Sequence, residues 1–119
     1  MSATGAVAPR SLELIRQLVA FPTVSRDSNL ALIEFVRGRL EPLGARIRLT
    51  WDDARGKANL FASLGPEGDG GIVLSGHTDV VPVEGQRWST NPFTLTERDG
   101  RLYGRGAADM KGFVAALLA

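Results

Sequence analysis

The single histidine of the chain lies two residues before an aspartate, in the segment Ser75-Gly76-His77-Thr78-Asp79. Residues i and i+2 of an extended segment project to the same side, so the Asp79 carboxylate can reach the His77 ring. A carboxylate in that position orients a metal-bound imidazole and raises its basicity. The alternative is a purely structural pair, a hydrogen-bonded histidine beside an aspartate in a turn, which is the more frequent outcome for an isolated His-x-Asp.

A second acidic candidate, Asp109, follows the glycine-rich segment Gly104-Arg105-Gly106. Aspartate is a favoured N-cap, and one interpretation is that Asp109 opens a helix. The other is that it binds a metal, because histidine together with carboxylate suits zinc. The two glycines match only the start of a dinucleotide fingerprint, and the sequence contains no phosphate-binding loop motif.

The elements before these residues begin with two amphipathic helices. Apolar side chains at helical spacing predict a first helix that is capped by Ser11 and ends before Pro22. A second helix is predicted over residues 29–40, with Ser28 as its N-cap and Gly44 after its C-terminal end.

The hydrophobic period then changes from helical to alternating. Residues 46–51 predict a half-exposed strand, and residues 59–64 predict its antiparallel partner. The continuous apolar run Ile72-Val73-Leu74 predicts a strand buried on both faces, which would place His77 at the carboxyl end of a strand, where ligands of open α/β sheets gather. Asp99-Gly100 predicts a hairpin. These elements together indicate an α/β domain.

Composition and charge exclude several classes of protein. The 119 residues include 14 Lys and Arg against 13 Asp and Glu, a net charge of +1, and no basic cluster is present, which argues against nucleic acid or a membrane surface as partner. No apolar run approaches the ~20 residues of a membrane span. The absence of cysteine excludes a disulfide scaffold and fits a cytoplasmic protein. Residues 1–10 are small and polar, which predicts a flexible N-terminus without a secretory signal.

The stretch of residues 113–119 is apolar and helix-forming, and it carries no stop signal. Such a segment needs a partner to bury it. We therefore expect residues 11–119 to be an incomplete domain of a longer protein, with a docked terminal helix as the alternative.

Three segments resemble, in order and spacing, the acetylornithine deacetylase and succinyl-diaminopimelate desuccinylase family of zinc metallopeptidases. Residues 75–82 resemble its first metal-binding segment, residues 88–93 its next signature, and residues 102–112 its second metal-binding segment. Within the family, Thr23-Val24-Ser25 and Ala107-Ala108-Asp109-Met110 are most similar to the deacetylase branch. The desuccinylase branch and other aminoacylases or dipeptidases are the alternatives.

The resemblance implies a role for each candidate residue. His77 would bind one divalent ion and Asp109 would bridge two, zinc in the first place and cobalt or manganese as substitutes. Asp79 would act as the catalytic residue that holds the His77 ring and sets the polarity of the site. The family also implies a cis peptide bond between Asp109 and Met110, and a catalytic domain with a mixed central sheet flanked by helices.

The implied reaction is the hydrolysis of a small N-acyl amino acid, N-acetyl-L-ornithine, to L-ornithine and acetate in arginine biosynthesis. The resemblance also implies a homodimer. The family's general base, its other metal ligands and its lid and dimerisation domain have no counterpart in this sequence. We therefore predict that the 119-residue chain alone is inactive. A non-catalytic module that binds a partner through its apolar end is the alternative from another class.

Overall fold

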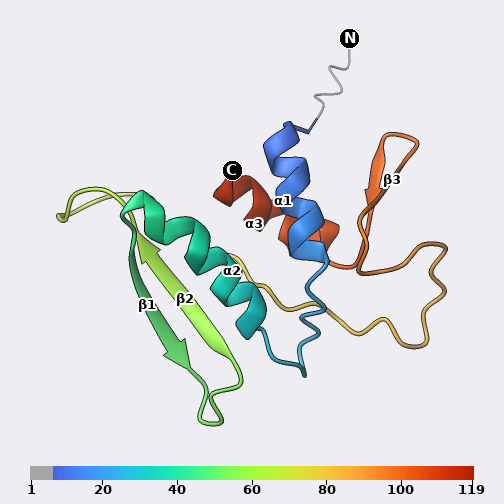
Figure 1. Ribbon diagram of the computed structural model, residues 1–119, viewed down its shortest axis with the longest axis horizontal. Helices are drawn as coiled ribbons and strands as arrows, with labels where there is room; N and C mark the ends of the chain where they lie inside the picture. Colours follow the sequence, from blue (N-terminus) through green and yellow to red (C-terminus); the bar gives the residue numbers. More distant parts are fainter. Residues whose placement is uncertain (1–6) are drawn as a thin grey trace.

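Three helices and two β-hairpins form the part of the chain that the computed structural model describes, residues 7–119 (Figure 1). The helices are α1 (Pro9–Val19), α2 (Leu30–Leu40) and α3 (Gly112–Leu118). The mixture of helices and strands confirms the predicted α/β class. Within residues 7–119, no helix has the length and apolar character needed to cross a membrane.

Helix α1 begins earlier than the sequence predicted. Pro9 occupies its first turn, where the missing proline N–H leaves no hydrogen bond unmade. Ser11 therefore lies inside the helix, and its assignment as the N-cap is wrong. Residues 1–6 of the predicted flexible N-terminus lie outside the described residues, whereas Pro9 and Arg10 belong to α1.

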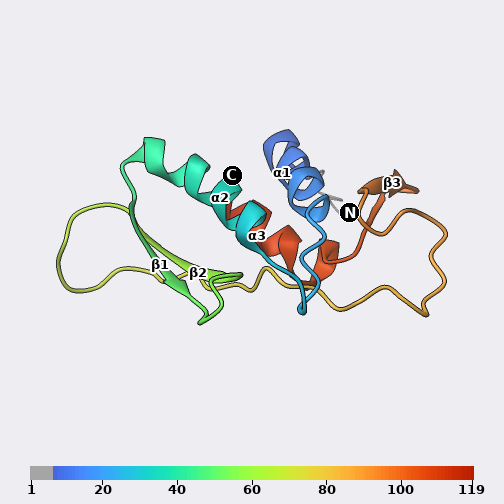
Figure 2. The same cartoon turned by 60° about the horizontal axis from the view of Figure 1, so that its bottom comes forward.

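The start of α2 is stabilised by two neighbouring polar residues. Asn29 is the N-cap, but its side chain pairs with the backbone of Ala58, donating at 2.8 Å and accepting at 3.0 Å. The prediction that Ser28 is the N-cap is therefore wrong, although its hydroxyl accepts a hydrogen bond from the Leu30 N–H at 3.2 Å. Asn29 thus ties α2 to the hairpin that packs beneath it (Figure 2).

The first hairpin pairs β1 (Arg46–Trp51) with β2 (Ala58–Ser63), antiparallel as predicted, with Leu49 opposite Leu60. The second hairpin pairs β3 (Thr96–Arg98) with β4 (Arg101–Tyr103). The predicted turn at Asp99-Gly100 has positive φ at both residues, 53° and 71°, as a tight two-residue hairpin turn requires. These local predictions are confirmed because turn chemistry and alternation act over a few residues.

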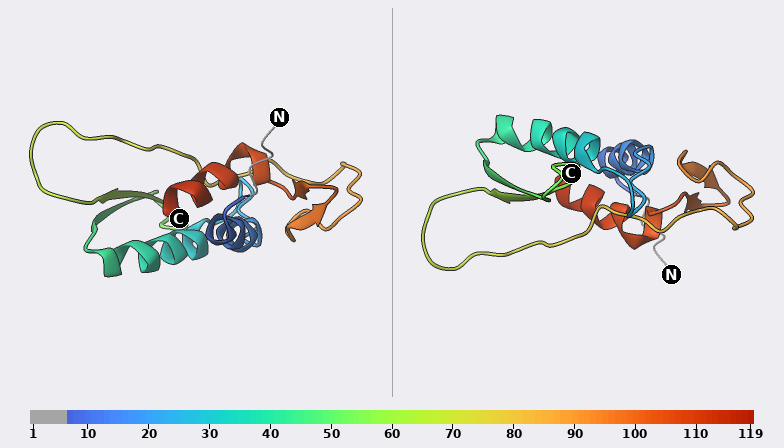
Figure 3. Two further views of the ribbon diagram at one scale, coloured as in Figure 1. Left: turned by 90° about the horizontal axis from the view of Figure 1, so that it is seen from above. Right: turned by 90° about the horizontal axis from the view of Figure 1, so that it is seen from below.

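The hydrophobic core lies between α1, α2 and α3. Helices α1 and α3 lie side by side, and the apolar faces predicted for the first two helices are buried (Figures 1 and 3). A short 3₁₀ turn, η1 (Glu41–Leu43), extends α2 and ends at Gly44, whose φ of 81° makes it the predicted C-terminal cap. The core side chains come from all three helices and from the β3–β4 region: Leu14, Ile15, Leu18, Val19, Leu32, Val36, Leu95, Ala115 and Leu118.

The expected buried strand at Ile72-Val73-Leu74 is not formed. These residues are 90%, 79% and 58% exposed, and neither two-stranded sheet of the described chain includes them. They end a wide glycine-rich arc that leaves the β1–β2 hairpin and returns toward α3 (Figure 3). An apolar run becomes a buried strand only when other strands pair with it, and within residues 7–119 none does.

The only charged side chain buried in the described part of the chain is Lys111, between Asp109 and α3. Its ammonium donates to the Phe21 carbonyl at 2.6 Å, which joins the end of α1 to the start of α3. Burial lowers the pKa of Lys111 from 10.5 to about 8. The folded chain therefore holds this proton less tightly than the unfolded chain does.

We expect the stability of the metal-free chain to rise as the pH increases from about 8 to 10.5. In that window the unfolded state binds more protons, so the free energy of unfolding increases with pH. Urea denaturation at a series of pH values measures the slope. Lys111→Met, which keeps the length of the side chain without the charge, should flatten it. An equal slope in wild type and variant would contradict this assignment.

Candidate metal centre

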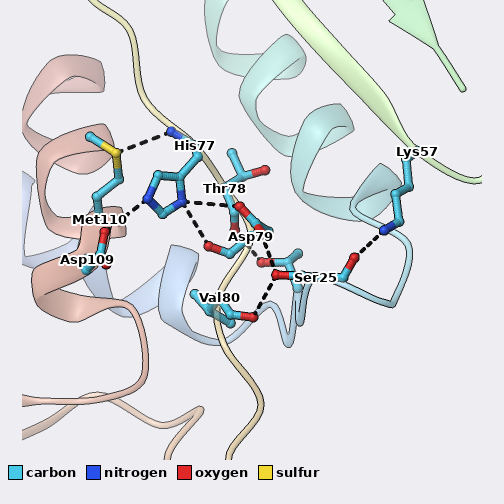
Figure 4. Close-up of polar contacts among 9 residues, drawn as sticks. Ser25, Lys57, His77, Thr78, Asp79, Val80, Asp109 and Met110 are labelled. Atoms are coloured by element: carbon cyan, nitrogen blue, oxygen red, sulfur yellow. Dashed lines mark hydrogen bonds and ion pairs between the residues drawn. The ribbon is translucent and has the colours of Figure 1, made fainter.

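Three segments that are distant in the sequence meet at the candidate site (Figure 4). The connection after α1 runs parallel to the segment that follows His77, with Val24 bridged to Val80. The Ser25 N–H donates to the Val80 carbonyl at 3.0 Å, and the Val80 N–H donates to the Thr23 carbonyl at 2.9 Å. The buried Thr23 adds a hydrogen bond from its hydroxyl to the Thr78 carbonyl at 2.6 Å.

This pairing corrects the predicted scaffold of the site. The segment that carries His77 was expected to be fixed by a buried strand at residues 72–74, but it is fixed by residues 23–25. Thr23-Val24-Ser25 entered the sequence predictions only through the family resemblance, without a structural role. What was missing is the long-range partner, because periodicity does not reveal which extended segments pair.

The imidazole of His77 lies between two aspartates (Figure 4). Its Nε2 lies 3.0 Å from Asp109 Oδ1. On the other edge of the ring, Nδ1 lies 3.0 Å from the Asp79 carbonyl oxygen and 3.2 Å from Asp79 Oδ1. The expected approach of residues 77 and 79 on one side of an extended segment is therefore observed. The structure also brings Asp109, 32 residues further on, to the same ring.

Asp109 is not a helix cap. It lies in η2 (Ala107–Lys111), an irregular helical turn, and its own φ and ψ of −128° and 94° are not helical. Helix α3 starts only at Gly112, so the N-cap interpretation is wrong. The Asp109 side chain is 86% exposed and reaches His77. The peptide bond from Asp109 to Met110 is cis, the conformation that the family resemblance implied.

Two glycines allow the segments to approach closely. A Cβ at Gly106, whose φ is +86°, would lie 2.7 Å from a methyl group of Val80, and a Cβ at Gly76 would lie 3.3 Å from Met110 Cε.

The His77 N–H also donates to the Met110 sulfur at 3.3 Å. A cavity of about 200 Å³ opens beside the imidazole, and its lining includes Ser25, His77, Asp79, Arg105, Ala108 and Asp109.

The electrostatics of the site follow from this arrangement. Partial burial opposes a charged imidazole, but the Asp79 carbonyl, the Asp109 hydrogen bond and the two nearby carboxylates outweigh it and raise the pKa of His77. The hydrogen bond from Ser25 is the largest cause that lowers the pKa of Asp79. Asp79 therefore stays ionised beside the ring, and protons compete with metal ions for Nε2 as the pH falls.

The donor set fits a divalent ion, although it is incomplete. His77 Nε2 and Asp109 Oδ1 converge on one region at the cavity, and one imidazole with one carboxylate matches the preferences of zinc. Within residues 7–119, no group of three or more His, Cys, Asp or Glu side chains is placed to hold a metal. Catalytic zinc sites use about three protein ligands, so His77 and Asp109 alone would not complete one.

The segment of residues 88–93 packs beside the site and does not line the cavity. The guanidinium of Arg105 lies 5.2 Å from the centre of the Trp88 ring, and the Arg105 N–H donates to the Pro92 carbonyl at 2.6 Å. Arg105 thus connects the Trp88 segment to the glycine-rich segment that leads to Asp109.

Comparison with known proteins shows similarity to a family of peptidases. Residues 73–119 match the model of the peptidase family M20/M25/M40, and this range contains His77, Asp79 and Asp109. The fold is similar to the crystal structure of human carnosine dipeptidase 1, with a TM-score of 0.75 and 31% sequence identity. That match covers 91% of this chain and 26% of the dipeptidase.

The most similar curated relatives share one name, acetylornithine deacetylase. The chain is 49% identical over 117 residues to acetylornithine deacetylase of Proteus mirabilis (strain HI4320), covering 92% of this chain and 30% of that protein. It is 44% identical over 119 residues to acetylornithine deacetylase of Salmonella paratyphi B, with 94% and 31% coverage. The family resemblance predicted from the sequence is thereby confirmed. The chain spans about 30% of the length of these relatives.

Proposed function

We propose that this chain is part of a metal-dependent amide hydrolase whose substrate is N-acetyl-L-ornithine. In this proposal His77 and Asp109 are metal ligands, and Asp79 orients His77. Water would hydrolyse the amide to L-ornithine and acetate, as a step of arginine biosynthesis in the cytoplasm. Two zinc ions, or cobalt or manganese, are the proposed cofactors, and a homodimer is the proposed assembly of the longer enzyme.

The observation that carries the proposal is the position of His77 between two carboxylates. Asp79 contacts the Nδ1 edge of the ring, so Nε2 is the nitrogen that faces Asp109 and the cavity. Metal-binding histidines are typically held by a carboxylate or carbonyl at the opposite ring nitrogen. A histidine without a role in metal binding needs no carboxylate at Nδ1 and no exposed carboxylate at Nε2, and His77 has both.

A bound divalent ion would supply Lewis-acid activation of the amide carbonyl and of water. The chain's own contribution is to hold the ligands in place. The Asp79 carbonyl and carboxylate fix the imidazole, the turn before α3 presents the Asp109 carboxylate, and the cavity beside them leaves room for a small substrate. Within residues 7–119, no further His, Cys, Asp or Glu side chain joins these two in a metal-binding group of three, so we propose that the longer enzyme supplies the remaining ligands and the general base.

A chimeric enzyme tests the proposed roles. Residues 1–119 replace the aligned part of the Proteus mirabilis acetylornithine deacetylase, to which they are 49% identical. We expect the purified chimera to release acetate from N-acetyl-L-ornithine, to lose activity on chelation, and to regain it with Zn²⁺. The host protein without the aligned part and the isolated 119-residue chain should both be inactive. Steady, metal-dependent deacetylation by the isolated chain would contradict its predicted inactivity. A folded, metal-loaded chimera without activity would contradict the proposed function.

The substrate needs a separate test, because the host contributes to the substrate pocket of the chimera. Sequencing the source gene past codon 119 shows whether the reading frame continues, and the longer product is then assayed. A preference for N-acetyl-L-ornithine over N-succinyl-diaminopimelate and over a dipeptide supports the deacetylase. A preference for the dipeptide would support the alternative that the similarity to carnosine dipeptidase 1 favours.

Replacing Asp79 with asparagine should weaken metal binding by about 10–100-fold, the usual effect of losing the partner of a metal-bound histidine. The amide keeps the size of the side chain but removes the charge that faces His77 Nδ1. Zinc titration of the chimera and of its Asp79→Asn variant measures the change. Asp69→Asn, a substitution in the exposed glycine-rich loop, is the control and should bind zinc like the parent. Unchanged zinc affinity in Asp79→Asn would show that Asp79 does not orient His77 for metal binding.

A further inference from the structure

The hydrogen bonds of Asp79 extend beyond His77 to a third residue, Ser25. The Ser25 hydroxyl donates to Asp79 Oδ2, while the other carboxylate oxygen, Oδ1, lies 3.2 Å from His77 Nδ1 (Figure 4). Each oxygen of the carboxylate thus has its own partner. Neither the family resemblance nor the comparisons give Ser25 a role.

The backbone of Ser25 is fixed independently of its side chain. Its N–H donates to the Val80 carbonyl at 3.0 Å, and its carbonyl accepts a hydrogen bond from the ammonium of Lys57, which immediately precedes β2. These contacts hold the Ser25 Cβ beside Asp79. A substitution that removes only the hydroxyl therefore leaves these backbone contacts in place. It removes the hydrogen bond to the carboxylate and a longer contact of the hydroxyl with the Val80 carbonyl at 3.4 Å.

The orientation of the Asp79 carboxylate matters because two acceptors compete for the single proton of a neutral imidazole. Asp79 faces Nδ1 and favours the tautomer with the proton on Nδ1, whereas Asp109 lies 3.0 Å from Nε2 and favours the proton there. Only the first tautomer leaves a lone pair on Nε2 for a metal. Half of the Asp79 side chain is exposed, so without Ser25 water can turn its carboxylate away from the ring.

We propose that Ser25 is a positioning residue that selects the metal-binding tautomer of His77 by fixing the Asp79 carboxylate against Nδ1. This inference rests on the proposed role of His77 as a ligand. The three contacts are present in the metal-free chain. The Ser25 hydroxyl donates to the Asp79 carboxylate, this carboxylate lies beside His77 Nδ1, and Nε2 faces Asp109 and the cavity.

The test uses the fact that the chain contains one histidine. The ¹⁵N chemical shifts of the two imidazole nitrogens report the tautomer directly, and no other histidine overlaps them. They are recorded on the metal-free 119-residue chain at a pH where His77 is neutral. Ser25→Thr keeps the hydroxyl, and Ser25→Val has nearly the same shape without it, so the two variants form a matched pair. Ser25 is exposed, which leaves space for the added methyl group.

We expect wild type and Ser25→Thr to show well-separated ¹⁵N shifts with the proton on Nδ1. In Ser25→Val the two shifts should move toward one another, as the tautomer with the proton on Nε2 gains population. The change will be partial, because the Asp79 carbonyl still lies 3.0 Å from Nδ1. Ser28→Ala, which removes the hydroxyl that accepts from the Leu30 N–H at the start of α2, is the control for loss of a serine elsewhere and should leave both shifts unchanged.

Identical shifts in Ser25→Val and Ser25→Thr, with dispersed amide spectra in both, would overturn the proposal. If Ser25→Val loses amide dispersion, Ser25→Ala removes the same hydroxyl without adding volume and is judged by the same shifts. The experiment contains no metal and measures no activity. Its failure would therefore show that Ser25 does not position Asp79 and would leave the hydrolase proposal standing, whereas an inactive chimera with normal shifts would do the reverse.

Discussion

Replacing Asp109 with asparagine will abolish metal-dependent hydrolysis by the chimeric enzyme, with a loss larger than the ~10–100-fold effect of removing a residue that only supports a ligand. The neutral amide cannot supply the negative charge that a carboxylate offers a divalent ion. The Asp109 side chain is 86% exposed, and its carboxylate contacts His77 Nε2. The folded structure should therefore survive the substitution.

Two measurements separate loss of chemistry from loss of structure in this variant. The urea midpoint of Asp109→Asn should match that of its parent, while its zinc affinity and its rate of acetate release collapse. Asp99→Asn provides the control, since Asp99 is an exposed carboxylate in the β3–β4 turn and asparagine tolerates its positive φ. Retention of even a tenth of the parent's activity, about 1.4 kcal/mol in barrier height, would show that Asp109 is not an essential ligand.

The largest effect on stability is expected for Leu18→Ala. Leu18 is fully buried in α1, where the helix packs against α3. Truncating a buried leucine removes transfer free energy and leaves a cavity, which costs about 2–5 kcal/mol. Such a loss is a large share of the stability of a domain near the lower end of the usual range of about 5–15 kcal/mol.

Equilibrium denaturation in urea tests this expectation, with Leu43→Ala as the matched control. Leu43 is 63% exposed in η1, and its truncation should change the free energy of unfolding by no more than about 0.5 kcal/mol. Similar losses in the two variants would mean that the core between α1 and α3 does not form in solution. Helix α3 would then be a poor platform for the turn that carries Asp109.

The sequence predicted the elements whose determinants are local. The alternation of residues 46–51 fixed the bounds of β1, and Asp99-Gly100 predicted the second hairpin. Helical spacing identified Ile15 and Val19, two of the buried side chains of α1, whereas Leu14 and Leu18 are buried as well. In each case the determinant and the structure lie within a few residues of one another.

The sequence did not predict the contacts that assemble the site. Residues 72–74 have the composition of a buried strand, but burial depends on neighbours that periodicity cannot supply. The bridge from Val24 to Val80 was missed for the same reason. His77 and Asp109 were candidates from their residue types and surroundings, and the motif resemblance implied that they belong to one site. Ser25 could be found only once its hydroxyl was seen beside Asp79.

The bridge between Val24 and Val80 has a consequence for the order of folding. Ser25 and Asp79 are 54 residues apart in the chain, and His77 and Asp109 are 32 apart, whereas each hairpin closes through a short turn. Hairpins form in about 1–10 μs, but joining distant segments first requires a large loop to close, at an entropic cost that grows with its length. The ligands are therefore brought together after the hairpins exist. A nascent chain with both hairpins already formed still keeps the two proposed ligands apart, and we expect it to gain affinity for a metal ion only when the His77 segment reaches the turn that carries Asp109.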